Sequence, residues 1–263
     1  MKNYLVIGNP IEHSLSPKLH NYWIKTNNIN AKYEKQKLKE NEIENIILKV
    51  KEKKIHGINV TVPFKKKVIY FLDRLSLEAN KTQSVNTIYL KDDKIVGHNT
   101  DIKGFELSIK NLKYNIIGKK VMILGAGGVV PSIILALSNM RVSEIIISNR
   151  TKKKAEELKN LFKNLKIVDW GEIPKFDIII NATSVGLNKN DEMNLDFSNV
   201  GRDKLFYDVI YNPKETNFLE TGKKLGNEIA NGKLMFVYQA FLAFNLWHGV
   251  QPKINNDVIK LLD

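Results

Sequence analysis

The sequence contains no cysteine, which excludes disulfide bonds, zinc sites built on thiolates and cysteine nucleophiles. Long apolar segments are also scarce, and Tyr4–Ile7 is too short for the apolar core of a signal peptide. A stretch of twenty uncharged residues, 121–140, contains three glycines and Pro131. It therefore predicts a strand, a turn and a buried helix rather than a membrane span. We expect a soluble, cytoplasmic protein with no membrane partner.

Arginine is scarce too, although the chain carries a formal charge of +13. Of the 41 basic residues only four are arginine, and the lysines are spread along the whole sequence. Reading of bases and bidentate contacts to phosphate favour arginine. We therefore interpret the lysines as solvated surface residues and expect no nucleic-acid partner. The sequence leaves open whether the protein is a monomer or a homodimer.

The length of 263 residues is typical of one large domain or two modest ones. The first hundred residues alternate short apolar segments with amphipathic ones. In this part the pattern predicts strands at 2–7, 33–38, 58–62, 85–90 and 95–97, and helices at 16–27, 41–53, 63–72 and 101–112. Ser16 is the expected N-cap of the first helix, with Pro17 at its first position. Asp92 and Asp93 are the expected turn of a hairpin.

From Lys119 onward, continuous apolar strands alternate with helices, which is typical of a doubly wound parallel sheet. The pattern predicts strands at 121–124, 144–148, 166–168, 177–181, 205–209 and 228–230, and helices that end near Ser138 and span 151–162. The last helix, 233–248, is apolar on nearly every face, so it must be buried, and we expect it to close the gap between two domains. The predicted architecture is an α/β substrate-binding domain, residues 1–101 and 238–263, plus a Rossmann-like domain, residues 102–237, with the C-terminal helices returning to the first domain.

A glycine-rich turn follows the first strand of the predicted Rossmann domain. Gly125, Ala126, Gly127 and Gly128 connect this strand to a helix, an arrangement that brings backbone N–H groups to a pyrophosphate. The third position of the dinucleotide pattern is Val130, where a small residue is expected. An ordinary strand–helix turn is the alternative interpretation.

The end of the second strand of that domain indicates which dinucleotide binds. An NAD site requires an acidic residue there, whereas this chain has Asn149, Arg150 and Thr151. A guanidinium and a hydroxyl can bind the 2′-phosphate that a carboxylate would repel. The sequence therefore predicts NADP as the cofactor.

Four polar segments of the first domain carry the candidate substrate site. Ser14 and Ser16, two residues apart before a helix, can both point a hydroxyl at an anion, although the spacing alone favours a helix cap. Asn59 and Thr61 share one face of a strand, and Lys65 is expected one turn into the next helix. The other two segments are 84–87 and 97–101. Asp101 is expected to cap a helix, a role compatible with a second one.

These segments come in the order found in the shikimate dehydrogenase family, which the chain resembles over nearly its whole length. The motifs are GNPIEHSLSPKLHN, GINVTVPFKK, SVNT, GHNTD, GAGG, SNRT, NATSVG, YDVIYNPKET and YQAFLAFNLWHG. The resemblance implies an NADP-dependent enzyme that reversibly reduces 3-dehydroshikimate to shikimate. The sequence departs from the family at Val129 and Val130, and at Ser148.

The resemblance also assigns roles to residues. It implies that Lys65 and Asp101 are the catalytic pair and that Ser14 and Ser16 bind the substrate carboxylate. The remaining expected substrate contacts are Asn59, Thr61, Asn86, Tyr211 and Gln239. Thr183, in the NATSVG segment, joins the expected cofactor contacts. Gln239 lies on an apolar helix and needs a hydrogen-bond partner, which could be a ligand hydroxyl or a backbone carbonyl.

No metal is expected, because His13 and His20 have no third ligand at metal spacing. Two other functions stay open at this point. One is a related enzyme of the same fold that acts on quinate or an aminated analogue. The other is a non-catalytic nucleotide-binding protein, against which the presence of both Lys65 and Asp101 argues.

Overall fold

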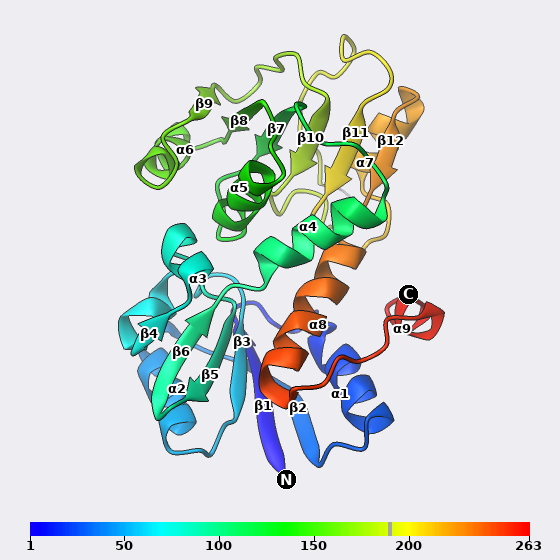
Figure 1. Cartoon of the computed structure of the whole chain (residues 1–263). Helices are drawn as coiled ribbons and strands as arrows, with labels where there is room; N and C mark the ends of the chain where they lie inside the picture. Colours follow the sequence, from blue (N-terminus) through cyan, green and yellow to red (C-terminus); the bar gives the residue numbers. More distant parts are fainter. Residues whose placement is uncertain (189–190) are drawn as a thin grey trace. The chain divides into compact units, whose positions relative to one another are not determined.

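The computed structural model describes residues 1–188 and 191–263, and the chain divides into two compact units. The first unit contains residues 1–104 and 237–263, and the second contains residues 105–236. Each unit is built around a six-stranded sheet (Figure 1). In the described part of the chain, no helix combines the length and the apolar character needed to cross a bilayer.

The sheet of the first unit is mixed, with strand order β2-β1-β3-β5-β6-β4. β1, β2 and β3 are parallel neighbours, whereas β3, β5 and β6 are antiparallel. The strands are β1 (Lys2–Gly8), β2 (Ala31–Lys37), β3 (Gly57–Val60), β4 (Arg74–Leu75), β5 (Thr87–Lys91) and β6 (Lys94–His98). The helices are α1 (Ser16–Thr26), α2 (Ile43–Lys51), α3 (Leu77–Thr82) and α9 (Asn256–Leu261), with α8 (Lys233–His248) belonging to this unit from Val237 onward.

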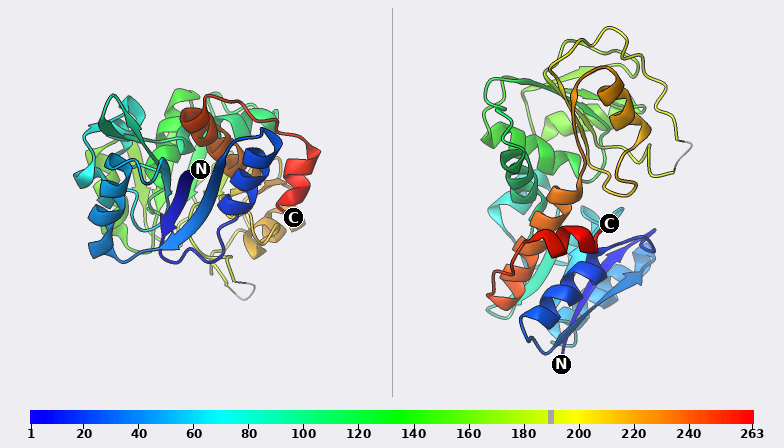
Figure 2. Two further views of the ribbon diagram at one scale, coloured as in Figure 1. Left: turned by 90° about the horizontal axis from the view of Figure 1, so that it is seen from below. Right: turned by 90° about the vertical axis from the view of Figure 1, so that its right-hand side faces the viewer.

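Alternation along the strands separates two layers of packing. Leu5 and Ile7 of β1 pack on α2 in an aliphatic core that Ile58 and Val60 of β3 also enter. Tyr4 of β1 faces the other way and contacts Trp247 of α8, their ring centroids 5.1 Å apart. α9 lies beside α1 (Figure 2).

The sheet of the second unit is entirely parallel, with strand order β12-β11-β10-β7-β8-β9. Counted from β7 this is the order 6-5-4-1-2-3 of the dinucleotide-binding fold, and it confirms the predicted Rossmann-like architecture. The strands are β7 (Lys120–Leu124), β8 (Glu144–Ser148), β9 (Leu165–Val168), β10 (Ile178–Asn181), β11 (Leu205–Asp208) and β12 (Glu228–Ala230). The helices are α5 (Val130–Asn139), α6 (Lys152–Glu157) and α7 (Asn217–Lys224), with α4 (Asp101–Asn111) belonging to this unit from Phe105 onward.

Most predicted elements are present, but two predicted helices and one predicted helix cap differ from the structure. The hairpin is confirmed, because Asp92 and Asp93 have φ of +50° and +53° between the antiparallel β5 and β6. The helix predicted over 151–162 is shorter, since α6 ends at Glu157 and a 3₁₀ helix, Leu158–Asn160, follows it. The prediction of a helix over 63–72 is wrong, because only a 3₁₀ helix forms there, at Lys67–Phe71. Ser16 is not an N-cap, because Leu15 has that position and Ser16 is the first helical residue.

Candidate active site

Lys65 and Asp101 form a buried ion pair in the first unit. Lys65 Nζ lies 2.5 Å from Asp101 Oδ2, and the two side chains are only 11% and 7% exposed. The residues are 36 positions apart in the sequence. An ion pair this close, with little water around it, fixes the positions of both charged groups.

The backbone explains why Lys65 lies in a turn rather than in the predicted helix. Its carbonyl accepts a hydrogen bond from the Val85 N–H at 2.9 Å, so this carbonyl is not available to a helix. Asp101, by contrast, is at the start of α4, where the Asn99 side chain accepts from its N–H at 3.0 Å. The pair is thus formed by one residue in a turn, Lys65, and one at the start of a helix, Asp101.

Asn86 links Asp101 to the residues around it. Its Nδ2 donates to Asp101 Oδ1 and to Thr100 Oγ1, both at 2.9 Å. Its Oδ1 accepts from the Thr100 N–H at 2.8 Å and from Thr87 Oγ1 at 3.0 Å. Asn86 is 2% exposed, so these contacts compensate for the loss of water and fix the carboxylate of Asp101.

Gln239 of α8 reaches the same group of residues. Asn86 Nδ2 lies 3.4 Å from Gln239 Oε1, across 153 positions of sequence. This contact brings α8 to the Asn86 network within the first unit. A side-chain amide is thus one partner of Gln239, besides the ligand hydroxyl or backbone carbonyl that the sequence suggests.

Ser14 and Ser16 lie at the start of α1. Ser16 is buried and Ser14 partly buried, and Ser14 Oγ accepts from the Ser16 N–H at 3.3 Å. Thr61 follows β3, and a Cβ on Gly8 would lie 2.5 Å from Thr61 Cγ2. This close approach requires glycine and brings the end of β1 against Thr61.

Asn59, on β3, belongs to a buried chain of hydrogen bonds. Its Nδ2 donates to the Asn86 carbonyl at 3.1 Å and to Thr87 Oγ1 at 3.2 Å. Its Oδ1 accepts from the phenol of Tyr33 at 2.7 Å. Asn59 is therefore held on both sides and joined to the backbone of Asn86.

The glycine turn of the second unit lies where the strand order reverses, between β7 and β10. Gly125 has a φ of +113°, and a Cβ on it would lie 2.9 Å from the Ala182 carbonyl oxygen. Ala126 is partly buried, whereas Gly127 and Gly128 are exposed. α5 begins at Val130, which is fully buried, so the helix starts directly after the turn despite the larger side chain. A turn with exposed backbone in front of a helix fits the pyrophosphate of a dinucleotide.

Asn149, Arg150 and Thr151 follow the adjacent strand β8. Asn149 Nδ2 donates to the Thr151 carbonyl at 2.8 Å, which shapes this turn. Arg150 is exposed and makes no ion pair within residues 1–188 and 191–263, whereas the neighbouring Lys152 pairs with Asp169 at 2.7 Å. A guanidinium at this edge fits the 2′-phosphate of NADP.

A buried carboxylate, Asp208, connects the loops that follow β10 and β11. It accepts from Asn181 Nδ2 at 3.1 Å, from Thr216 Oγ1 at 2.7 Å and from the Ile210 N–H at 2.9 Å. Asn181 Oδ1 in turn accepts from Thr183 Oγ1 at 2.7 Å. Burial raises the pKa of Asp208 to about 6, and the three hydrogen bonds oppose that shift. Thr183 is thereby positioned from the interior of the second unit.

Tyr211 lies on the loop after β11, close in sequence to Asp208. Its ring stacks on Phe236 with the centroids 4.5 Å apart. The structure therefore places Tyr211 in the second unit, whereas Lys65 and Asp101 belong to the first.

The family of the chain follows from its similarity to known proteins over both units. The model of the shikimate dehydrogenase substrate binding domain matches residues 6–88, and that of shikimate / quinate 5-dehydrogenase matches residues 106–214. A relative from Pelagibacter ubique, named shikimate dehydrogenase (NADP(+)), is 57% identical over 262 residues, which cover 100% of this chain and 99% of that protein. The chain belongs to the shikimate dehydrogenase family.

Solved structures of this family share the fold. The shikimate dehydrogenase from Aquifex aeolicus has a TM-score of 0.91 at 35% identity and covers 100% of this chain and 97% of its own. The enzyme from Thermus thermophilus, solved with NADP(H) and shikimate, has a TM-score of 0.89 at 28% identity, with coverage of 100% and 97%.

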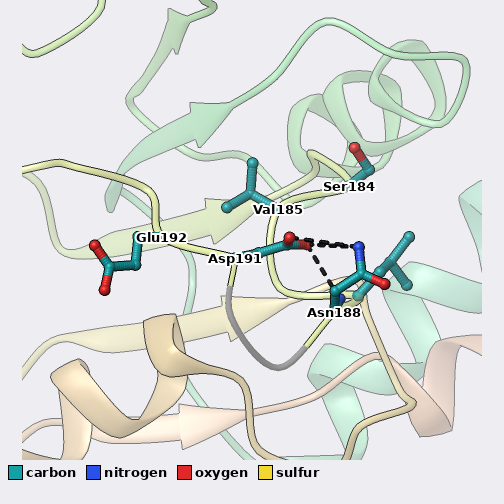
Figure 3. Close-up of a pocket in the computed structure, with 6 residues that line it drawn as sticks. Ser184, Val185, Asn188, Asp191 and Glu192 are labelled. Atoms are coloured by element: carbon teal, nitrogen blue, oxygen red, sulfur yellow. Dashed lines mark hydrogen bonds between the residues drawn. The ribbon is translucent and has the colours of Figure 1, made fainter.

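One pocket of this family member is lined by residues that follow Thr183 in the sequence (Figure 3). It is lined by Ser184, Val185, Leu187, Asn188, Asp191 and Glu192. The Asp191 carboxylate accepts from the backbone N–H groups of Gly186 and Asn188, each at 3.1 Å, and these bonds lower its pKa. Asp191 thus stabilises the turn after the NATSVG segment. Among the described residues no cluster of three or more His, Asp or Glu side chains could hold a metal ion.

Sequence reasoning did not identify several polar residues that build the site. Thr87, Asn99 and Thr100 surround Asn86 and Asp101, and they lie in the polar segments that attracted attention without being assigned a role. Tyr33 lies in a strand of ordinary composition, so no signal in the sequence pointed to its contact with Asn59. Asp208 lies in the YDVIYNPKET motif, but nothing in this motif predicts that its carboxylate is buried.

Proposed function

We propose that this chain catalyses the reversible, NADPH-dependent reduction of 3-dehydroshikimate to shikimate. Membership of the shikimate dehydrogenase family supports this activity, and the relative from Pelagibacter ubique is named for NADP. The observation that carries the proposal is the buried ion pair of Lys65 and Asp101. Reduction of a ketone develops negative charge on the carbonyl oxygen, and such a pair provides both compensating charge and a proton.

Lys65 and Asp101 act together in this proposal. The Lys65 ammonium stabilises the charge on the oxygen, and the proton that this oxygen gains comes from the pair. Asp101 keeps Lys65 in place through the 2.5 Å contact, and Asn86 in turn holds Asp101 Oδ1. Because these groups are ordered before the substrate binds, little reorganisation is needed during the reaction.

The substrate contacts are part of the proposal. Ser14 and Ser16 bind the carboxylate, and Thr61, Asn86 and Gln239 hold the hydroxyls, with Asn59 beside them and Tyr211 near the substrate. The close approach of Gly8 to Thr61 and the contact between Asn86 and Gln239 support a common site for several of these residues. We assign substrate binding to residues 1–101 and 238–263.

The cofactor contacts fall in the second domain, which we assign to residues 102–237. The glycine turn at 125–128 and Thr183 hold the dinucleotide, and Asn149, Arg150 and Thr151 hold its 2′-phosphate. When bound, NADPH supplies the hydride that reduces the ketone carbon. The exposure of Arg150 and the left-handed backbone of Gly125 support this assignment.

The direct test is an assay of NADPH oxidation with 3-dehydroshikimate, followed by absorbance at 340 nm. Parallel reactions with quinate, and with NAD in place of NADP, separate the related enzymes of the same fold. We expect turnover with 3-dehydroshikimate and a strong preference for NADP. Absence of turnover in folded protein would refute the proposal in favour of a non-catalytic nucleotide-binding protein.

Variants of Lys65 test the role of the pair. Lys65→Ala should lower kcat by at least about a hundredfold with a much smaller change in substrate affinity, because the ammonium matters most when charge develops on oxygen. Lys65→Met, which keeps most of the side-chain volume, should show the same loss. Lys66→Ala is the control, since Lys66 is exposed. Equal losses in the Lys65 and Lys66 variants, or a normal kcat in both Lys65 variants, would contradict the assignment.

A further inference from the structure

The phenol of Tyr33 lies inside the first unit against one of the proposed substrate-binding residues, Asn59. Tyr33 is on β2 and is only 2% exposed. Its hydroxyl donates to Asn59 Oδ1 at 2.7 Å. Burial raises the pKa of the phenol well above its usual value, and the Ser16 side chain acts in the opposite direction. The hydroxyl thus connects β2 to β3, which carries Asn59.

The ring of Tyr33 is itself fixed by aromatic packing. His20 stacks on it with the centroids 4.2 Å apart and the planes 2° from parallel. Trp247 approaches the same ring, with centroids 6.1 Å apart. A phenol held in this way has little rotational freedom, so its hydroxyl points in one direction before any ligand arrives.

From the phenol the chain of hydrogen bonds continues toward the reacting groups. Asn59 Nδ2 donates to the Asn86 carbonyl and to Thr87 Oγ1. Asn86 then contacts Asp101. Every one of these side chains is less than 10% exposed, and loss of the Tyr33 hydroxyl would leave the buried Asn59 Oδ1 without this hydrogen bond.

We propose that Tyr33 is a positioning residue for substrate binding: its buried hydroxyl fixes the orientation of the Asn59 amide in the substrate site. This role rests on the proposed function of the chain. Tyr33 itself contacts no reacting atom, because its hydroxyl is used by Asn59. Its effect therefore belongs to substrate affinity and not to the chemical step.

The test is Tyr33→Phe, which removes the hydroxyl and keeps the ring that stacks on His20. In shikimate oxidation by NADP, the KM for shikimate should rise about three- to tenfold, the effect of one lost hydrogen bond. The kcat should change less than twofold, and the KM for NADP should stay at the wild-type value. The Kd of shikimate, measured by calorimetry, should rise by the same factor as KM.

Tyr207→Phe is the matched control. Tyr207 is also fully buried, and its phenol is 3.0 Å from Ser108 Oγ, but it lies in the second unit. This substitution should lower thermal stability to a similar extent while the KM for shikimate stays unchanged. An unchanged KM in folded Tyr33→Phe, or an equal rise in KM in Tyr207→Phe, would overturn the positioning role.

A double-mutant cycle tests the route through Asn59. Tyr33→Phe should raise the KM for shikimate less in the Asn59→Ala background than in the wild type. Full additivity in this background would overturn the proposal. The wild-type reaction separates this outcome from failure of the proposed function: an inactive wild type refutes the function, whereas an active wild type with an unaffected Tyr33→Phe refutes only the role of Tyr33.

Discussion

The buried side chain of His20 makes the free energy of unfolding of the protein depend on pH. The ring is 0% exposed, and neither of its nitrogens has a hydrogen-bond partner among the described residues. Burial lowers its pKa from 6.5 to about 3, and the nearby His248 adds to this shift. Between about pH 6.5 and pH 3, His20 therefore binds a proton in the unfolded chain but not in the folded protein.

The sign and size of the effect follow from this difference. Because the unfolded state binds more protons in this range, the free energy of unfolding falls as the pH falls below 6.5. At pH 5 the loss attributable to His20 is about 2 kcal/mol, from 1.5 pH units at about 1.4 kcal/mol each. Burial also lowers the pKa of His248 to about 4, so this residue acts in the same direction.

The measurement is urea unfolding at pH 7 and pH 5, followed by tryptophan fluorescence. His20→Phe keeps a flat ring against Tyr33 and removes the titrating group. Between pH 7 and pH 5 this variant should lose about 2 kcal/mol less stability than the wild type. His13→Ala is the control, because His13 is exposed, and it should keep the wild-type pH dependence. If His20→Phe and the wild type lose the same stability, His20 is not held neutral and the reasoning is wrong.

Two further predictions concern binding. Ser14→Ala and Ser16→Ala should each raise the KM for shikimate by roughly ten- to a hundredfold, because each removes a hydroxyl donor to a carboxylate. A drop in thermal stability of Ser16→Ala with an unchanged KM would instead indicate a purely structural role. Arg150→Ala should weaken NADP binding by about 1.5–3 kcal/mol and leave NAD binding almost unaffected, since NAD has no 2′-phosphate. The measurement is the ratio of kcat/KM with NADP to kcat/KM with NAD. It is made at moderate ionic strength, where the field of the neighbouring lysines is screened. A ratio equal to that of the wild type would show that Arg150 does not contact the cofactor.

The sequence predicts the regular parts of this fold well. The bounds of β8, β12 and α8 agree with the prediction. For β8 and α8 this is because a continuous apolar segment or a largely apolar helix has few alternative places to pack. The segment after Pro63 shows where local pattern fails. Its helix is prevented by a distant hydrogen bond, from the Val85 N–H to the Lys65 carbonyl, which local residue preferences cannot reveal.

In the site, too, the sequence predicts features that depend on neighbouring residues but not contacts between distant segments. Composition and spacing indicate polar strand ends, but the pairing of Lys65 with Asp101 was implied only by the family resemblance. The link from Tyr33 to Asn59 joins two strands that are not neighbours in the sheet, and nothing in either segment predicts it. Burial of Asp208 likewise depends on β11 lying inside its sheet, which is a property of the assembled unit.

The division of the first unit into two chain segments determines the order in which the nascent protein can fold. Residues 105–236 form the second unit without interruption, so they can fold as soon as they leave the ribosome. The first unit must wait for residues 237–263, because the Trp247 indole donates to the Ile88 carbonyl and the Trp23 indole donates to the Lys253 carbonyl, both at 3.2 Å. Until then the aromatic face of its sheet has no cover from α8, so apolar side chains stay exposed to water during synthesis.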